Sequence, residues 1–450
     1  MTLESTAGQT AAAEPAVSPA QTVIAPPRKP AAEPAFLPKE PETLEEAGLT
    51  FGQVESLVLK FLLNHGSATG RNIADHVRLP FGLLNRVLFQ LKSQLILTYI
   101  GSAPMNDYEY DLTEAGVQRA RRFSERCTYF GSAPVTLEDY IAGVHAQSVR
   151  REKPRVEELL AAFKDLTLPT AIISQIGQAI SAGMSFFLYG SPGNGKTSIA
   201  ERVIGTLSRE IWIPRTLTVT GEMIRLYDPS NHRPAEKGNS VLDAARYDRR
   251  WVKIRRPTIV AGGELTLKQL EITTNHNTGI SEAPLQLKSN CGVLVIDDFG
   301  RQRCSTDELL NRWIVPLEKR VDYLSLPSGR QIEVPFDQLL VFSTNLEPRK
   351  LVDEAFLRRI PYKIEVLDPS EKQFTELFLK LAAAHGFQCP VGVVEGLLAR
   401  HYRDAVRTLR FCHARDLLLQ AKHFCLFHEQ PMVLTPAILD VAVNNYFAGI

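Results

Sequence analysis

The nine-residue segment GSPGNGKTS at 190–198 constrains the fold of this chain more than any other feature. It follows a short apolar run at 185–189 and precedes a helical pattern that begins near Ile199. A strand, a glycine-rich loop and a helix in this order are typical of a phosphate-binding loop. The glycines let several backbone N–H groups point at the β- and γ-phosphates, and the helix N-terminus adds the positive end of its dipole. The segment therefore predicts an α/β domain that binds a nucleoside triphosphate.

Two residues of this loop carry its side-chain chemistry. Lys196 supplies a positive charge to the phosphates, and Thr197 places a hydroxyl group on Mg²⁺, as in other loops of this type. The pattern therefore implies ATP and Mg²⁺ as cofactors. The predicted nucleotide-binding residues are Gly190, Ser191, Pro192, Gly193, Asn194, Gly195, Lys196, Thr197 and Ser198.

A second motif, GVLVIDDFG at 292–300, points to the same site. Its four apolar residues predict a buried strand that carries two carboxylates to its C-terminal end, where α/β sheets bind ligands. We expect Asp297, with Thr197, to hold Mg²⁺, and Asp298 to orient and polarise the attacking water. Taken alone, an apolar run that ends in Asp-Asp is a weak signal, but behind a complete phosphate loop it is a strong one.

The chain divides into segments of different composition. Residues 1–46 are rich in proline and alanine and predict a disordered tail. Residues 47–126 predict helix, helix, helix, hairpin and helix, the order of a small α+β winged-helix domain, with a connector at 127–165. Short β-rich runs alternate with helical segments over 166–367, which predicts a parallel sheet covered by helices. The remainder, 368–450, predicts a helical lid.

From about Leu166 to Ile450 the sequence resembles the AAA+ ATPases. VFSTN at 341–345 looks like the sensor-1 strand, in which Asn345 helps to hold the water opposite the γ-phosphate. The segment before it resembles the helix and presensor hairpin of enhancer-binding activators, with the hairpin turning at Pro327–Gly329. The resemblance implies a homo-oligomeric ring, with a hexamer favoured.

Three arginines are assigned through the same resemblance. DEAFLRRI at 353–360 resembles the arginine-finger stretch of Clp disaggregases, so Arg358 and Arg359 would enter the neighbouring subunit's site and neutralise charge on the transferring phosphoryl group. CHARDLL at 412–418 looks like the sensor-2 helix of the lid, with Arg415 reaching the nucleotide. A solvated or ion-paired helix face is the alternative for each arginine.

The sequence departs from the family pattern between the phosphate loop and the acidic motif at 297–298, where relatives usually have fewer residues, and this predicts an insertion near 211–290. Its centre is the basic segment 246–256, in which Trp251, Lys253 and Arg255 would share one face of a strand. Such a face is a candidate surface for DNA or for an acidic polypeptide. The alternative is ordinary solubilising charge.

The winged-helix segment carries few cations for a DNA-binding domain. Its predicted recognition helix, Phe81–Leu95, has Arg86 and Lys92, whereas the hairpin carries the acidic residues Asp107 and Glu109. Phosphate contacts supply most of the affinity of DNA-binding domains. We therefore expect this segment to bind protein rather than DNA.

Composition narrows the remaining choices. Lys and Arg total 51 against 50 for Asp and Glu, so net charge gives no global attraction to nucleic acid or membranes. The six cysteines are scattered, and no leader or membrane-length apolar stretch is present, so we expect a cytoplasmic protein with no membrane partner. The favoured function is chaperone-like ATP-driven remodelling of a protein client. A DNA-bound regulator or initiator, and a slow nucleotide-gated switch with Asp298 where most relatives have Glu, are the alternatives.

Overall fold

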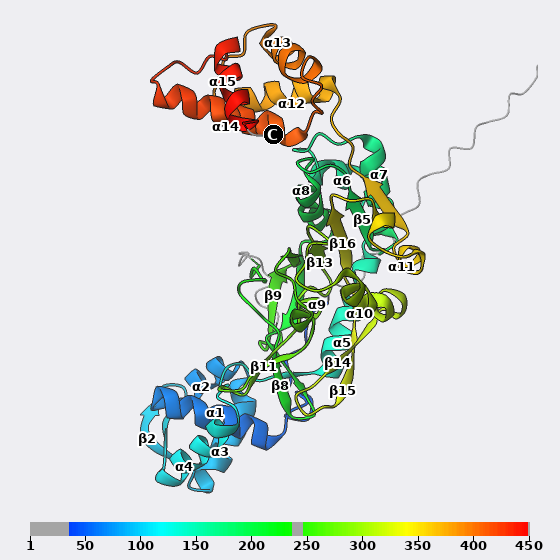
Figure 1. Ribbon diagram of the computed structural model, residues 1–450. Helices are drawn as coiled ribbons and strands as arrows, with labels where there is room; N and C mark the ends of the chain where they lie inside the picture. Colours follow the sequence, from blue (N-terminus) through cyan, green and yellow to red (C-terminus); the bar gives the residue numbers. More distant parts are fainter. Residues whose placement is uncertain (1–35, 236–245, 449–450) are drawn as a thin grey trace, which may run out of the picture. The chain divides into compact units, whose positions relative to one another are not determined.

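The computed structural model describes residues 36–235 and 246–448 (Figure 1). Most of the predicted tail and part of the predicted insertion therefore lie outside the described residues. Residues 36–46 are described, and they correct the predicted boundary of the tail. The ring of Phe36 packs edge-on against Trp251, with 5.5 Å between ring centroids, and the carbonyl of Pro38 accepts a hydrogen bond from the backbone of Asp248. Local composition misses this order because the partners lie far away in the sequence.

Residues 50–126 form a small α+β module. Thr50 and Thr113 begin its first and last helices, because each side chain accepts a hydrogen bond from a backbone N–H of the first turn. Helix, helix, helix, hairpin and helix follow in the expected order, although the hairpin begins two residues later than Leu95, which adopts a left-handed φ of 58°. The elements are α1 (Phe51–His65), β1 (Ala68–Thr69), α2 (Gly70–Val77), α3 (Phe81–Ser93), β2 (Leu97–Ala103), β3 (Asp107–Leu112) and α4 (Glu114–Arg126).

The connector contains one short strand and three short helices. It contributes a strand to a neighbouring sheet, because β4 pairs in parallel with β7 (Thr216–Val219). The elements are β4 (Val135–Thr136), α5 (Leu137–Ala146), η1 (Val149–Arg151) and α6 (Val156–Ala162).

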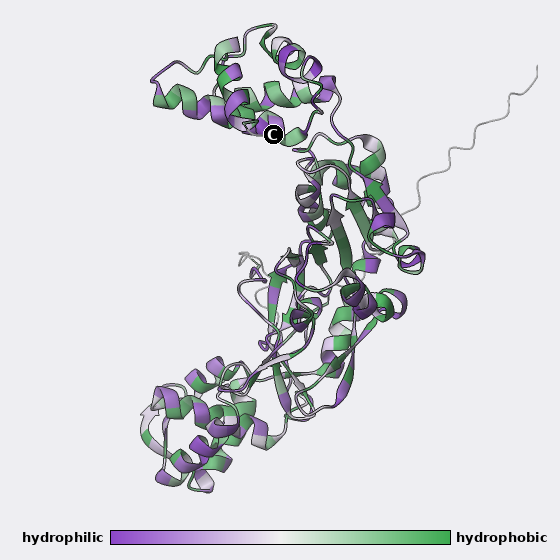
Figure 2. Cartoon of the chain, in the orientation of Figure 1, coloured by the Kyte–Doolittle hydropathy of each residue, from purple (hydrophilic) through white to green (hydrophobic). Residues whose placement is uncertain are grey.

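Five parallel strands form the central sheet, in the order β10, β13, β16, β5, β17. Apolar residues of α7 (Thr170–Ser181) and α8 (Lys196–Arg202) cover one face, and those of α10 (Thr306–Lys319) cover the other. Figure 2 shows the strands between these helices as mainly hydrophobic, as expected for a sheet buried on both faces. The strands are β5 (Phe186–Tyr189), β10 (Thr258–Ala261), β13 (Val293–Ile296), β16 (Leu339–Thr344) and β17 (Tyr362–Glu365). This sheet confirms the predicted parallel α/β core.

The region 211–290 is not one continuous insertion. Strand β10 lies inside it and belongs to the central sheet, so the additional structure is divided into two parts. Sequence reasoning missed this strand because a run of four residues, TIVA, has no distinctive periodicity. The additional elements are β6 (Glu210–Pro214), β7, β8 (Glu222–Arg225), β9 (Trp251–Arg255), β11 (Thr273–Asn275), β12 (Ile280–Glu282) and α9 (Leu285–Lys288).

The C-terminal third begins with an antiparallel hairpin after α10. Strands β14 (Val321–Ser325) and β15 (Gln331–Pro335) pair and turn at Pro327–Gly329, as predicted. Beyond α11 (Glu354–Arg359) and β17, helices share a separate apolar core. They are α12 (Glu371–Ala384), α13 (Val393–Leu398), α14 (Phe411–Phe427) and α15 (Pro436–Tyr446). Over 36–235 and 246–448, no helix has the length and apolar character needed to span a bilayer.

Candidate functional site

The predicted loop residues, the two acidic residues and Asn345 meet at the C-terminal ends of β5, β13 and β16, which are neighbours or next neighbours in the sheet. Of the strands of this sheet, the next one after β5 in the sequence is β10, which lies three places away on one side, whereas β17 lies on the other side. Ligands of open α/β sheets bind where the strand order changes in this way. The phosphate loop follows β5 at that position.

The loop backbone has the conformation that only glycine adopts easily. Gly190, Gly193 and Gly195 have φ values of 136°, 84° and 79°. A Cβ atom on Gly190 would lie 2.4 Å from the carbonyl oxygen of Val366, so the loop also needs glycine there for space. Gly195 is the N-cap of α8, so the helix begins directly at Lys196.

Lys196 lies at the centre of the site. Its Nζ donates hydrogen bonds to the carbonyls of Gly190 and Ser191, at 3.0 and 2.9 Å, and to Oδ1 of Asn345, at 2.8 Å. Burial lowers the pKa of Lys196, whereas the charges of Asp297 and Asp298 raise it. The structure thus brings together the loop cation, both acidic residues and Asn345, the predicted sensor-1 residue.

The two residues predicted to hold Mg²⁺ are in contact. Oγ1 of Thr197 donates a hydrogen bond to Oδ2 of Asp297 at 2.8 Å. Among the described residues, no group of three or more His, Cys, Asp or Glu side chains is placed to hold a metal ion. A hydroxyl and one carboxylate suit Mg²⁺, which is usually bound by one or two carboxylates together with substrate phosphates and water.

Asp298 has an unusual backbone conformation. Its φ of 47° lies in the left-handed region, which residues other than glycine seldom adopt and which is often found at functional sites. The side chain is exposed, and Nδ2 of Asn345 lies 3.4 Å from its Oδ1. Asp298 and Asn345 therefore face the same space beside the phosphate loop.

The predicted finger arginines differ in their surroundings. Arg359 is held by its own chain, because it pairs with Glu318 at 2.9 Å and donates to the carbonyl of Ala355 at 2.7 Å. The side chain of Arg358 is 81% exposed, and its pair with Glu354 is long, at 3.9 Å. Arg358 is therefore the arginine that can reach outside the chain.

The lid brings Arg410, and not the predicted Arg415, to the phosphate loop. Arg415 pairs with Asp416 on its own helix, and its side chain is 63% exposed. Arg410 is the N-cap residue of α14, forms an ion pair with Asp368 and contributes a positive charge near Lys196.

Two further contacts connect the lid to the loop. The amide of Asn194 donates to Asp368 at 2.7 Å, and the backbone N–H of Cys412 donates to the carbonyl of Gly193 at 2.9 Å. Burial raises the pKa of Asp368, but the hydrogen bonds from Asn194 and Arg410 outweigh burial and lower it overall. Asp368 therefore accepts hydrogen bonds as a carboxylate.

The basic segment 246–256 is largely part of the interior, which corrects its interpretation as a binding face. Trp251 is only 4% exposed, because Phe36 and the connector cover it, whereas Lys253 is exposed and pairs with Glu210. Arg250 is buried, pairs with Asp248 and donates to two backbone carbonyls of other segments.

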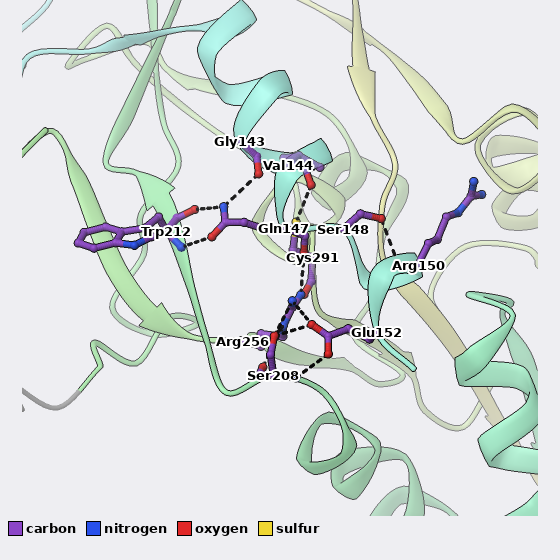
Figure 3. Close-up of polar contacts among 10 residues, drawn as sticks. All are labelled: Gly143, Val144, Gln147, Ser148, Arg150, Glu152, Ser208, Trp212, Arg256 and Cys291. Carbon is purple, nitrogen blue, oxygen red and sulfur yellow. Dashed lines mark hydrogen bonds and ion pairs between the residues drawn. The ribbon is translucent and has the colours of Figure 1, made fainter. Parts of the chain in front are cut away.

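Arg256 forms the network drawn in Figure 3. Its guanidinium donates to Glu152 at 2.7 Å and to Ser208, and also to the carbonyls of Gln147 and Cys291. It therefore connects the connector with the segment that follows α8 and with the start of β13. These contacts indicate that the charge of Arg256 stabilises the fold rather than binding a partner.

The hairpin of the N-terminal module is less acidic at its surface than its sequence indicates. Asp107 is 3% exposed and caps α2 by accepting hydrogen bonds from the backbone of Gly70 and Arg71 at 3.1 and 2.9 Å. Large apolar side chains of the module are exposed: Met105, in the hairpin turn, is 79% exposed, and Phe89, on α3, is 65% exposed.

Comparisons with known proteins give one family match and a set of similar solved structures. A family model described as a domain of unknown function (DUF8689) matches residues 370–445. No curated protein sequence matches the chain. Among solved structures, the Thermotoga maritima RuvB Holliday junction branch migration motor is 14% identical, with 61% of this chain and 68% of that chain covered and a TM-score of 0.34. NtrX from Brucella abortus in complex with ATP is 11% identical, with 64% and 60% covered and a TM-score of 0.40.

Proposed function

We propose that this chain is an ATPase of the AAA+ type that binds Mg²⁺·ATP at the phosphate loop. The observation that carries the proposal is the meeting of Lys196 with Asn345, and of Thr197 with Asp297, at the carboxyl ends of three neighbouring strands. These residues come from segments far apart in the sequence. Structural packing alone gives no reason for a lysine, two acids and two polar side chains to converge there.

Each residue has a role that follows from its position. The loop N–H groups and Lys196 bind and orient the phosphates, and Thr197 with Asp297 holds Mg²⁺, which neutralises phosphate charge when bound. Asp298 accepts the proton of the attacking water, and Asn345 holds that water in line. Arg410 places the lid cation beside the loop. Binding of the nucleotide between core and lid would then move the lid against the rest of the chain.

The exposure of Arg358 supports a site completed by a neighbouring subunit of a homo-oligomeric ring. We expect Arg358→Ala to lower the turnover rate by about 10³-fold or more, as loss of an arginine finger does, and the matched control Arg359→Ala to lower it far less. Mixing Arg358→Ala with Asp298→Asn subunits should restore part of the ATPase activity, because some interfaces then join an intact site to an intact finger. Activity per subunit that is independent of concentration, with no restoration on mixing, would contradict a shared site.

The favoured client is a protein. Exposed apolar side chains on the N-terminal module, with Phe89 on the predicted recognition helix, suit a protein partner better than a phosphate backbone. The DNA-bound regulator is the second reading, and the slow switch is the third. Steady-state ATPase rates of the full chain with and without duplex DNA separate them: stimulation by DNA favours the regulator, and a rate below about one turnover per hour favours the switch, against the roughly 1–10³ per second of typical enzymes.

A further inference from the structure

Strand β10 lies at the edge of the central sheet, with β13 as its partner among the described residues. The carbonyls of Pro257 and Ala261 accept hydrogen bonds from the β13 side, from the backbones of Val293 and Asp297 at 2.9 Å each. Alternate residues of a strand direct their backbone groups to opposite edges. Thr258 and Val260 therefore direct their N–H and C=O groups away from β13, toward the open edge.

A cavity of about 880 Å³ lies along this edge. Besides Thr258 and Val260, its lining includes Arg209, Arg233 and Arg256. Backbone hydrogen bonds fix the segments that carry these arginines, because Arg256 N donates to Arg209 O and Arg255 N donates to Arg233 O, at 2.9 Å each. Arginine side chains therefore line the cavity beside the open edge of β10.

Two of these arginines are available to bind an acidic partner. Arg256 is already paired with Glu152, but Arg209 and Arg233 are exposed, and neither forms an ion pair with any residue of the described ranges. Glu201 and Glu210 also line the cavity, and Glu210 is paired with Lys253. The lining therefore holds four arginines, of which Arg209, Arg233 and Arg255 are exposed, against the two glutamates.

We propose that β10 binds an acidic polypeptide segment in extended conformation, which adds a strand to the sheet and places carboxylates on Arg209 and Arg233. A peptide backbone can pair with the outward N–H and C=O groups of Thr258 and Val260, whereas nucleic acid has no matching repeat. A peptide can also place neutral residues opposite Glu201, whereas a nucleic acid carries a charge at every phosphate. This site is separate from the phosphate loop and needs no nucleotide.

The test uses the full chain without nucleotide and a fluorescein-labelled decapeptide of alternating Glu and Val. Fluorescence anisotropy should show a Kd in the micromolar range, and the same peptide with Lys in place of Glu should not bind. Arg209→Glu/Arg233→Glu should raise the Kd at least tenfold. The matched control Arg121→Glu/Arg122→Glu, which reverses two exposed arginines on α4, should change it less than twofold. If the reversal variant melts at a lower temperature than the wild type, Arg209→Gln/Arg233→Gln replaces it.

Strand addition is tested separately from charge with two N-methylated peptides, one methylated at every Glu and one at every Val. Only one edge of the peptide pairs with β10, so one of the two should lose at least tenfold in affinity. Equal binding by both versions, or no binding of the parent peptide, overturns the proposal. Tighter binding of a 20-nucleotide DNA, abolished by the same arginine reversal, also overturns it and assigns the cavity to nucleic acid.

Discussion

A single methyl group added to the phosphate loop can disturb the contact between this loop and the lid. A Cβ atom on Gly193 would lie 2.4 Å from Sγ of Cys412, whereas a Cβ on Gly195 would meet no atom within 4 Å. Both glycines have positive φ, so Gly193→Ala and Gly195→Ala share a backbone cost of about 1–2 kcal/mol. Overpacking against the lid adds about 1–3 kcal/mol to Gly193→Ala alone. If the lid must rest on the loop to hold ATP, this difference weakens binding about 5- to 150-fold.

The assay is the Kd of a fluorescent ATP analogue, measured by anisotropy with the full chain. Gly193→Ala should bind the ATP analogue about 5- to 150-fold more weakly than Gly195→Ala does. Cys412→Ala removes the clashing sulfur and leaves its Cβ at 3.4 Å from the new atom, so Gly193→Ala/Cys412→Ala should recover most of the difference. Equal affinities of the two glycine variants, with no recovery in the double variant, would refute a lid that rests on the loop when ATP is bound.

Three other predictions concern the chemistry and the lid. Asp298→Asn should bind ATP normally and turn over about 10²–10⁴-fold more slowly, as measured by phosphate release, and normal turnover would show that another group activates the water. Arg410→Ala should weaken ATP binding about 10- to 100-fold in calorimetry, from the loss of a charge-assisted contact, whereas Arg415→Ala should change it less than threefold. Burial lowers the pKa of His413 to about 4, below its unfolded value of about 6.5, so the neutral ring stabilises the fold above pH 6.5 and this stability is lost as the pH falls toward 4. Thermal melting at pH 5 should show a loss of about 2 kcal/mol relative to pH 7, and His413→Gln should lose less.

In the lid, Arg410 rather than the predicted Arg415 lies near the phosphate loop. Arg410 is the N-cap residue of α14 and has an extended backbone, with φ −134° and ψ 146°, whereas Arg415 lies within the helix, so the two side chains leave the chain in different directions. Sequence similarity placed an arginine at the start of a lid helix but did not show which one faces the loop. The docking of α14 on Gly193, through the backbone of Cys412, decides this.

Surface predictions failed for a related reason. Alternation along a strand predicted that Trp251 would share an exposed face with Lys253, and charge counting placed Asp107 on the surface of the hairpin. Trp251 is covered by Phe36, and Asp107 caps α2, so each is buried by residues that no local pattern identifies as partners.

The sequence by itself determined the chemistry that lies in continuous motifs: the glycine-rich loop with Lys196 and Thr197, the strand that ends in Asp297 and Asp298, and the parallel α/β core around them. These motifs can be recognised in the sequence because backbone conformation and strand burial depend on residues close together in the chain. Only the tertiary structure decided which arginines face the site and which basic residues form internal ion pairs. It also decided that β10 is an edge strand. Those properties depend on contacts between segments far apart in the sequence, whose relative positions no local pattern encodes.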